Sequence, residues 1–190
     1  MKVGLFFGSF NPLHIGHLLI ANTFVETTDI QRVLFVVTPQ NPFKKLSSLA
    51  HEFDRFDMVK AAISDNENFD VSDIEFSLPK PNYTIHTLTY LKSKHPKDEF
   101  VLLIGEDNLT HFHKWKNSEI ILEDYEVYVY PRPNAKKSDL HDHPKVKLVD
   151  LPLIDVSATF IRSAIRENRS IQYLVPKEVE DLIRSRKLYL

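Results

Sequence analysis

The sequence predicts an α/β fold with a doubly wound parallel sheet, and three observations lead to this prediction. Short apolar runs that suit buried strands recur along the 190 residues, and segments with apolar residues at helical spacing separate them. The first strand–helix–strand unit, residues 3–38, has the connection length that a parallel crossover requires. Strands that are apolar throughout are typical of parallel sheets covered by helices on both faces.

The elements follow in order along the chain. The expected strands are the apolar or alternating runs at residues 3–7, 32–38, 71–76, 100–104, 126–130 and 146–151. The expected helices are residues 14–27, 53–63, 84–94, 120–122, 159–167 and 176–186. Pro39, Gly105 and Pro131 close the second, fourth and fifth strands. Pro176 suits the start of the last helix. Residues 131–144, rich in proline and charge, are expected to form a mobile surface loop.

The composition excludes several classes of protein. The chain has no cysteine, which rules out disulfide scaffolds, thiolate metal sites and a cysteine nucleophile. A net charge of -2, from 24 basic and 26 acidic residues, offers no electrostatic footprint for nucleic acid. No apolar run approaches the ~20 residues of a membrane span, and the start of the chain has only about six residues before its turn, too few for a secretory signal. We therefore expect a cytoplasmic protein that binds neither nucleic acid nor a membrane.

The turn after the first strand has the properties of an anion site. The chain has only 4 glycines, and Gly4, Gly8 and Gly16 all fall in its first sixteen residues. Gly8 allows the backbone to turn sharply and to approach a ligand closely. Ligands of open parallel sheets bind beyond the carboxyl ends of the strands. The next helix directs its free N–H groups and the positive end of its dipole toward this turn, so the turn suits a phosphate.

Side chains of the same turn offer further hydrogen-bond donors. Ser9 and Asn11 carry polar groups, and His14 and His17, three residues apart, share one face of the first helical turn. Both histidines can donate to phosphate oxygens. Taken alone, such a pair is more often just polar surface or part of a metal site, but no nearby carboxylate or cysteine completes a zinc shell. The spacing also differs from dinucleotide-binding and P-loop motifs.

The complete string resembles the GxFxPxHxGH signature of the nucleotidyltransferase superfamily. The matching residues are Gly8, Phe10, Pro12, His14, Gly16 and His17. The resemblance implies a Rossmann-like nucleotidyltransferase fold with C-terminal helices, formed by residues 1–190 as a single domain. It also implies that this turn holds nucleotide phosphates, with Gly8, Ser9, Phe10 and Gly16 in ATP binding and His14 and His17 in catalysis.

A second candidate site begins at Ser157, which suits an N-cap. Thr159 adds a hydroxyl, and Arg162, one turn further on, carries a planar fork of donors suited to phosphate. By themselves these residues fit a capped surface helix with an exposed arginine equally well or better. They resemble the SSTxIR-like motif of adenylyltransferases, which binds the triphosphate, with Ala158 in place of the second serine. The resemblance assigns Ser157 and Thr159 to ATP binding and Arg162 to catalysis.

The middle of the chain resembles the bacterial nicotinate-nucleotide adenylyltransferases. Residues 39–44 are similar to P-x-x-P-H-K, with Phe43 replacing histidine, and the resemblance implies that Lys44 is a catalytic point charge near the phosphates; a solvated lysine is the alternative. Residues 54–58 are similar to HRxxM, with Asp54 replacing histidine, and we interpret them as structural. Residues 174–176 and 188–189 match the family's helical C-terminal tail.

Further matches imply the remaining substrate contacts. Residues 82–88 are similar to SYTxxTL, with Asn82 replacing serine, and residues 105–109 followed by Trp115 are similar to GADN…W, with Glu106 replacing alanine. The resemblance implies that Gly105 and Asp107 bind ATP. It implies that the mononucleotide contacts Tyr83, Thr84, Trp115 and Arg132, with the tryptophan stacked on the pyridine ring. Packing roles for Tyr83 and Trp115 are the alternatives. We expect the His141-Asp142-His143 segment to be solvated rather than a metal site.

The reaction that the resemblance implies joins ATP and nicotinate mononucleotide to give deamido-NAD and pyrophosphate. The attacking 5′-phosphate is already ionised, so the protein's task is positioning and charge neutralisation. Mg²⁺ is expected as the cofactor, held mainly by the ATP phosphates. A nicotinamide mononucleotide or pantetheine-phosphate adenylyltransferase and a non-catalytic nucleotide sensor are the alternatives. The choice between acid and amide at the pyridine, and between a monomer and a homo-oligomer, stays open.

Overall fold

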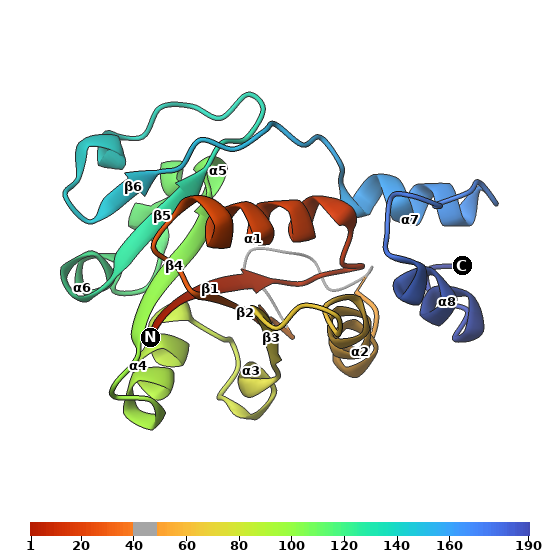
Figure 1. The fold of residues 1–190 in the computed structure, drawn as a ribbon, viewed down its shortest axis with the longest axis horizontal. Coiled ribbons are helices and arrows are strands. Elements are labelled where there is room, and N and C mark those ends of the chain that lie inside the picture. The colour runs from red at the N-terminus through yellow and green to blue at the C-terminus, as the bar shows by residue number, and fades with distance from the viewer. Residues whose placement is uncertain (40–48) are drawn as a thin grey trace.

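Six parallel strands form one sheet in the computed structural model, which describes residues 1–39 and 49–190. The sheet has the order β3-β2-β1-β4-β5-β6 (Figure 1). Its strands are β1 (Lys2–Gly8), β2 (Arg32–Val37), β3 (Phe69–Ser72), β4 (Glu99–Gly105), β5 (Glu126–Tyr130) and β6 (Val146–Leu148). The predicted parallel sheet is therefore confirmed. The strand order reverses between β1 and β4, and such a switch point opens a crevice beyond the carboxyl ends of the two strands.

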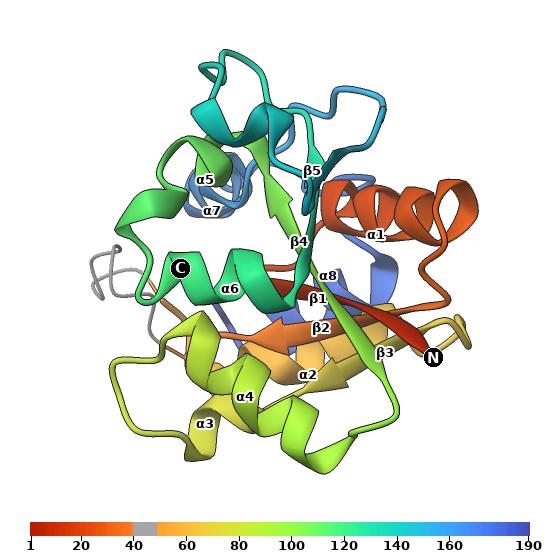
Figure 2. The same cartoon turned by 90° about the vertical axis from the view of Figure 1, so that its left-hand side faces the viewer.

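Helices cover both faces of the sheet. They are α1 (Ile15–Thr27), α2 (Glu52–Ala62), α3 (Ile74–Ser77), α4 (Thr84–Lys94), α5 (Glu106–Thr110), α6 (Ser118–Asp124), α7 (Ala158–Arg166) and α8 (Lys177–Ser185), with short 3-10 turns at Phe112–Lys114 (η2) and Asp139–Asp142 (η3). Figure 2 shows α4 and α6 on one side of the sheet and α1 on the other. One apolar core contains Phe24 of α1, Met58 of α2 and Ile161 of α7. A second core contains Leu88 of α4 and Ile121 of α6.

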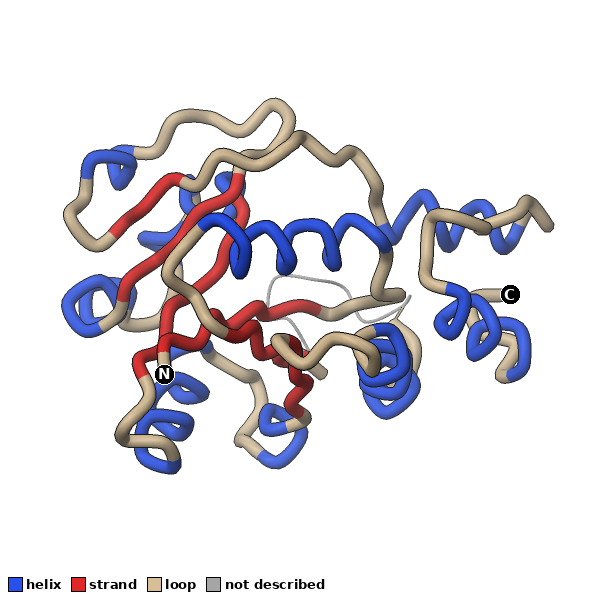
Figure 3. The backbone as a smooth tube through the Cα atoms, in the orientation of Figure 1, coloured by secondary structure: helices blue, strands red, loops and turns tan. Residues whose placement is uncertain are grey.

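The two C-terminal helices lie at one end of the molecule, beyond the sheet (Figure 3). Helix α8 packs against α2, and Arg186 Nη1 lies 2.7 Å from Asp54 Oδ1 and 2.8 Å from Asp57 Oδ2 across this contact. Helix α8 and Arg186 thereby hold α2 in place. Among the described residues, no helix is long and apolar enough to cross a bilayer.

The structure corrects the predicted elements in three places. Residues 71–76 are not one strand, because β3 ends at Ser72 and α3 begins at Ile74. The Ser72 hydroxyl, at the last residue of β3, accepts a hydrogen bond from the Ile74 N–H, so the chain turns into α3 here instead of continuing the strand. The last strand ends at Leu148 rather than at residue 151, and helix α5 was not predicted. The 131–144 stretch contains the ordered turn η3.

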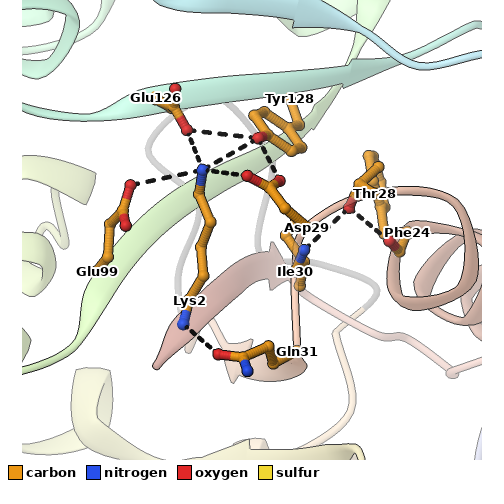
Figure 4. Close-up of polar contacts among 9 residues, drawn as sticks. All are labelled: Lys2, Phe24, Thr28, Asp29, Ile30, Gln31, Glu99, Glu126 and Tyr128. Carbon is orange, nitrogen blue, oxygen red and sulfur yellow. Dashed lines mark hydrogen bonds and ion pairs between the residues drawn. The ribbon is translucent and has the colours of Figure 1, made fainter.

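A partly exposed ion cluster, shown in Figure 4, joins the amino ends of the strands. Lys2 Nζ lies 2.7 Å from Asp29 Oδ2, 2.5 Å from Glu126 Oε2 and 3.5 Å from Glu99 Oε1. The Lys2 ammonium and the Tyr128 hydroxyl donate to Asp29 and lower its pKa to about 2. One lysine thus ties the first residues of β1, β4 and β5 to the α1–β2 connection.

Candidate active site

A cleft of about 790 Å³ opens beyond the carboxyl ends of β1 and β4. Gly8, the last residue of β1, and Gly105, the last residue of β4, both line it. The other predicted site residues on its walls are Ser9, Phe10, His14, His17, Tyr83, Thr84, Asp107, Trp115, Arg132, Ser157, Thr159 and Arg162. Lys44 and its neighbour Phe43 lie outside the described residues. The cleft therefore brings together predicted groups from five separate segments of the chain.

The histidine pair stands at the start of α1. The two rings stack with their centroids 3.7 Å apart and an interplanar angle of 27°. The His14 N–H donates to His17 Nδ1 over 3.2 Å. Because Nδ1 is an acceptor, a neutral His17 carries its proton on Nε2 and can donate from there.

Burial affects the charge of His14, one of the two histidines predicted to offset phosphate charge. Its side chain is buried, and this desolvation, helped by the positive charge of Arg132, lowers the pKa of His14 to about 4. His14 is therefore neutral at pH 7 when the cleft holds no anion. It can still donate one hydrogen bond to a phosphate oxygen, and a polyanion beside it would favour its protonated form.

Two residues of the first motif have packing roles. Phe10 is only 2% exposed, and its ring lies under Gly8 and 5.1 Å from the His17 ring. A Cβ atom on Gly8 would come within 2.7 Å of Phe10 Cζ, so the glycine makes room for this ring. Gly16 does not line the cleft. A Cβ atom there would lie 3.1 Å from His14 Nδ1, so Gly16 leaves space for the His14 imidazole. The ATP contacts predicted for Phe10 and Gly16 stay predictions.

The C-terminal motif meets the first motif directly. The Arg162 guanidinium donates through Nη1 to the Asn11 carbonyl over 2.8 Å and through Nη2 to Thr159 Oγ1 over 3.3 Å. The Ser157 hydroxyl accepts from the Phe160 N–H and caps α7, as predicted. Figure 1 shows the start of α1 beside α7. Two loops separated by most of the chain therefore build one wall of the cleft.

An aromatic corner, formed by Tyr83 and Trp115, also lines the cleft. Tyr83 immediately precedes α4, and Thr84 is its first residue. Trp115 is half-buried and stacks on Phe112, with centroids 5.0 Å apart. Lys116 Nζ lies 4.5 Å from the centre of the Tyr83 ring. Trp115 therefore has a packing contact, and it also borders the cleft, where a planar ring could stack on it.

Asp107 and Arg132 lie close together beyond β4. Arg132 Nε is 3.8 Å from Asp107 Oδ1, and Arg132 Nη2 donates to the Tyr130 hydroxyl over 3.3 Å. A Cβ atom on Gly105 would come within 2.5 Å of Asp107 Oδ1. The glycine therefore permits the carboxylate to sit directly against the strand end.

Sequence patterns did not reveal Glu75 as a cleft residue. Its side chain is 2% exposed, and Oε1 accepts from the Thr87 hydroxyl over 2.8 Å. Its carbonyl accepts from Asn82 Nδ2 over 2.9 Å. Burial raises the pKa of Glu75. No periodicity marks this residue; the only available signal was Thr87, which shares a helix face with Thr84.

The histidines of the 131–144 stretch also differ from expectation in part. The side chain of His141 is 8% exposed, and its Nε2 lies 2.9 Å from Glu106 Oε1, so it is packed and paired rather than solvated. Within residues 1–39 and 49–190, no group of three or more histidine, aspartate or glutamate side chains is placed to hold a metal ion.

Comparisons with known proteins agree with this architecture. A family model described as cytidylyltransferase-like matches residues 5–188. A probable nicotinate-nucleotide adenylyltransferase of Cytophaga hutchinsonii is 62% identical over 189 residues, covering 100% of this chain and 98% of that relative. A relative with the same description from Flavobacterium johnsoniae is 47% identical, covering 100% and 99%. The solved Plasmodium falciparum nicotinic acid mononucleotide adenylyltransferase complexed with NaAD superimposes with a TM-score of 0.84 at 20% identity, covering 99% of this chain and 97% of that one.

Proposed function

The chain belongs to the cytidylyltransferase-like family, among its nicotinate-nucleotide adenylyltransferases, and from this premise we propose how its cleft performs the reaction. The enzyme transfers the adenylyl group of ATP to nicotinate mononucleotide and releases pyrophosphate. The assignment of residues rests on one observation. The hydrogen bond from Arg162 to the Asn11 carbonyl joins the C-terminal motif to the first motif, which carries the histidine pair.

The first motif and Arg162 bind the ATP phosphates. The 5′-phosphate oxygen of the mononucleotide attacks the α-phosphorus of ATP, and the bond from that phosphorus to the bridging oxygen of pyrophosphate breaks. The attacking oxygen is already ionised, so no general base takes part. Negative charge grows on the departing pyrophosphate, and donors fixed in place before the reaction stabilise it. His17 Nε2–H and the Arg162 guanidinium supply these donors, and the positive end of the α1 dipole adds to their effect.

The aromatic corner binds the mononucleotide. The pyridine ring stacks on Trp115, and its carboxylate meets the N-terminus of α4 at Thr84. Asp107 accepts a ribose hydroxyl at the strand end, beside Arg132. This arrangement places the two polyanions in one cleft, so that their phosphates meet there.

Magnesium enters as part of the ATP substrate. The acidic side chains that line the cleft, Glu75 and Asp107, do not form a resident cage, and Glu75 is bonded to Thr87. Mg²⁺ keeps several waters and prefers substrate phosphates to an all-protein site. Pyrophosphate release is expected to stop when EDTA removes the metal and to recover when Mg²⁺ is added back.

Pyrophosphate release with a panel of acceptors tests the proposal. The protein is supplied with ATP and Mg²⁺ together with nicotinate mononucleotide, nicotinamide mononucleotide or phosphopantetheine. We expect release with nicotinate mononucleotide to exceed release with the other two. Turnover with phosphopantetheine alone would overturn the assigned acceptor. ATP binding without turnover on any acceptor would indicate a nucleotide sensor.

A further inference from the structure

A buried arginine beneath the cleft has no part in the reaction described so far. Arg55, on α2, is 1% exposed. Its guanidinium donates through Nη1 to the carbonyls of Ser9 (2.6 Å) and Thr38 (2.8 Å), through Nη2 to Pro39 (3.1 Å) and through Nε to Ala50 (2.9 Å). All these acceptors are main-chain carbonyls. The side chain therefore holds the course of the backbone rather than another side chain.

These carbonyls belong to the loops that begin at the carboxyl ends of β1 and β2. Ser9 follows β1 and Thr38 follows β2, and both residues line the cleft. The Thr38 N–H also donates to the Gly8 carbonyl over 2.9 Å, which places the two loops side by side. A planar guanidinium can reach several acceptors in fixed directions at once, whereas an ammonium cannot. The Arg55 side chain thus fixes the backbone of the loop that carries Ser9, which is proposed to bind the ATP phosphates.

The positive charge of Arg55 has no close acidic partner. Of the described residues, no carboxylate lies within ion-pair distance of it, and Glu52 acts on it only from further away. Residues 40–48, outside the described part, contain neither aspartate nor glutamate. Tyr189 faces both Arg55 and Arg162, but burial raises the pKa of its hydroxyl, which stays neutral. A buried charge without a counter-ion is costly, and a polyphosphate in the cleft would supply one.

We propose that Arg55 is a positioning residue for adenylyl transfer, which fixes the Ser9 and Thr38 main chain under the ATP phosphates and adds an uncompensated positive charge behind them. The inference rests on the proposed function, because it assumes that the Ser9 side of the cleft binds ATP. It concerns a residue that sequence patterns assigned to structure alone.

Kinetic comparison of Arg55→Lys and Arg55→Met with the wild type tests the proposal. Lysine keeps the positive charge but loses the planar guanidinium with its several donors, and methionine loses both the charge and the donors. We expect kcat to fall about 10²-fold in Arg55→Met and less in Arg55→Lys. We expect KM for ATP to rise in both variants, while KM for nicotinate mononucleotide changes less than threefold. Calorimetric titration with Mg²⁺-ATP alone is expected to show the same order of weakening.

Arg186→Met is the matched control. Arg186 also contacts α2, through Asp54 and Asp57, but it lies on the surface and away from the cleft. We expect this variant to lower the melting temperature and to leave kcat and both KM values unchanged. Variants of Arg55 with the kinetic constants of this control would overturn the proposal.

Two further outcomes are decisive. If Arg55→Met does not fold, a folded Arg55→Lys with wild-type KM for ATP and wild-type kcat would also overturn the proposal. A wild-type protein that releases no pyrophosphate would instead contradict the proposed function, and Mg²⁺-ATP titration of the Arg55 variants would still decide whether Arg55 organises an ATP site.

Discussion

Replacement of His17 by asparagine separates the proposed catalytic role of this ring from its structural role. An asparagine oxygen occupies nearly the position of a histidine Nδ1, so His17→Asn keeps the acceptor for the His14 N–H. The variant loses Nε2–H, the donor assigned to the phosphates. It also loses the ring contacts with Phe10 at 5.1 Å and Phe6 at 6.0 Å.

The structure sets the expected magnitudes. Loss of one preorganised donor to a developing oxyanion costs about 2.7–4 kcal/mol, so kcat should fall by ~10²–10³. Each lost edge-to-face ring contact is worth about 0.5–1.5 kcal/mol, so the free energy of unfolding should fall by about 1–3 kcal/mol. In a chain of this length, each kcal/mol lost from the free energy of unfolding lowers the melting temperature by roughly 2–4 °C. The fold should survive.

The assay measures steady-state pyrophosphate release at saturating ATP and nicotinate mononucleotide, with thermal melting of the same preparation. His17→Ala is the companion variant. It also loses the acceptor for the His14 N–H, worth about 1 kcal/mol, so it should be less stable than His17→Asn and no more active. Near-normal turnover of His17→Asn would refute the reasoning, because only Nε2–H distinguishes its polar contacts from those of the wild type.

Three further perturbations test other parts of the molecule. Trp115→Ala should raise KM for the mononucleotide by about 3–10-fold with little change in KM for ATP; equal effects would indicate a packing role. Gly8→Ala drives a Cβ to within 2.7 Å of the Phe10 ring, so urea titration should show a loss of about 1–3 kcal/mol, accompanied by a higher KM for ATP. Lys2→Met should cost about 1 kcal/mol at pH 7, because the carboxylates that pair with Lys2 are at least a third exposed. Because the folded pKa of Asp29 is about 2, below its ordinary value, this difference should persist above pH 4 and shrink as the pH falls toward 2; a pH-independent difference would contradict it.

Local sequence patterns were sufficient for the sheet and for the first half of the site. The run from Gly8 to His17 is one strand–turn–helix unit, whose backbone geometry depends on neighbours in sequence. Its histidine pair lies on one face of α1 because residues three apart share a helix face. The Thr84–Lys94 helix was predicted at its observed bounds for the same reason. Residues 71–76 do not form one strand, because the Ser72 hydroxyl binds the Ile74 N–H and the chain turns into α3 despite the alternating pattern.

The amino-acid order alone determined the fold class, the turn after β1 and the residue types proposed for phosphate recognition, since each is set within one or two consecutive elements. Only the tertiary structure decided that Arg162 reaches the Asn11 carbonyl, 151 residues away, that His14 is buried deeply enough to stay neutral, and that Arg55 lies beneath Ser9. Burial, desolvation and contacts between distant loops arise from how elements pack, and no local spacing of residues encodes them.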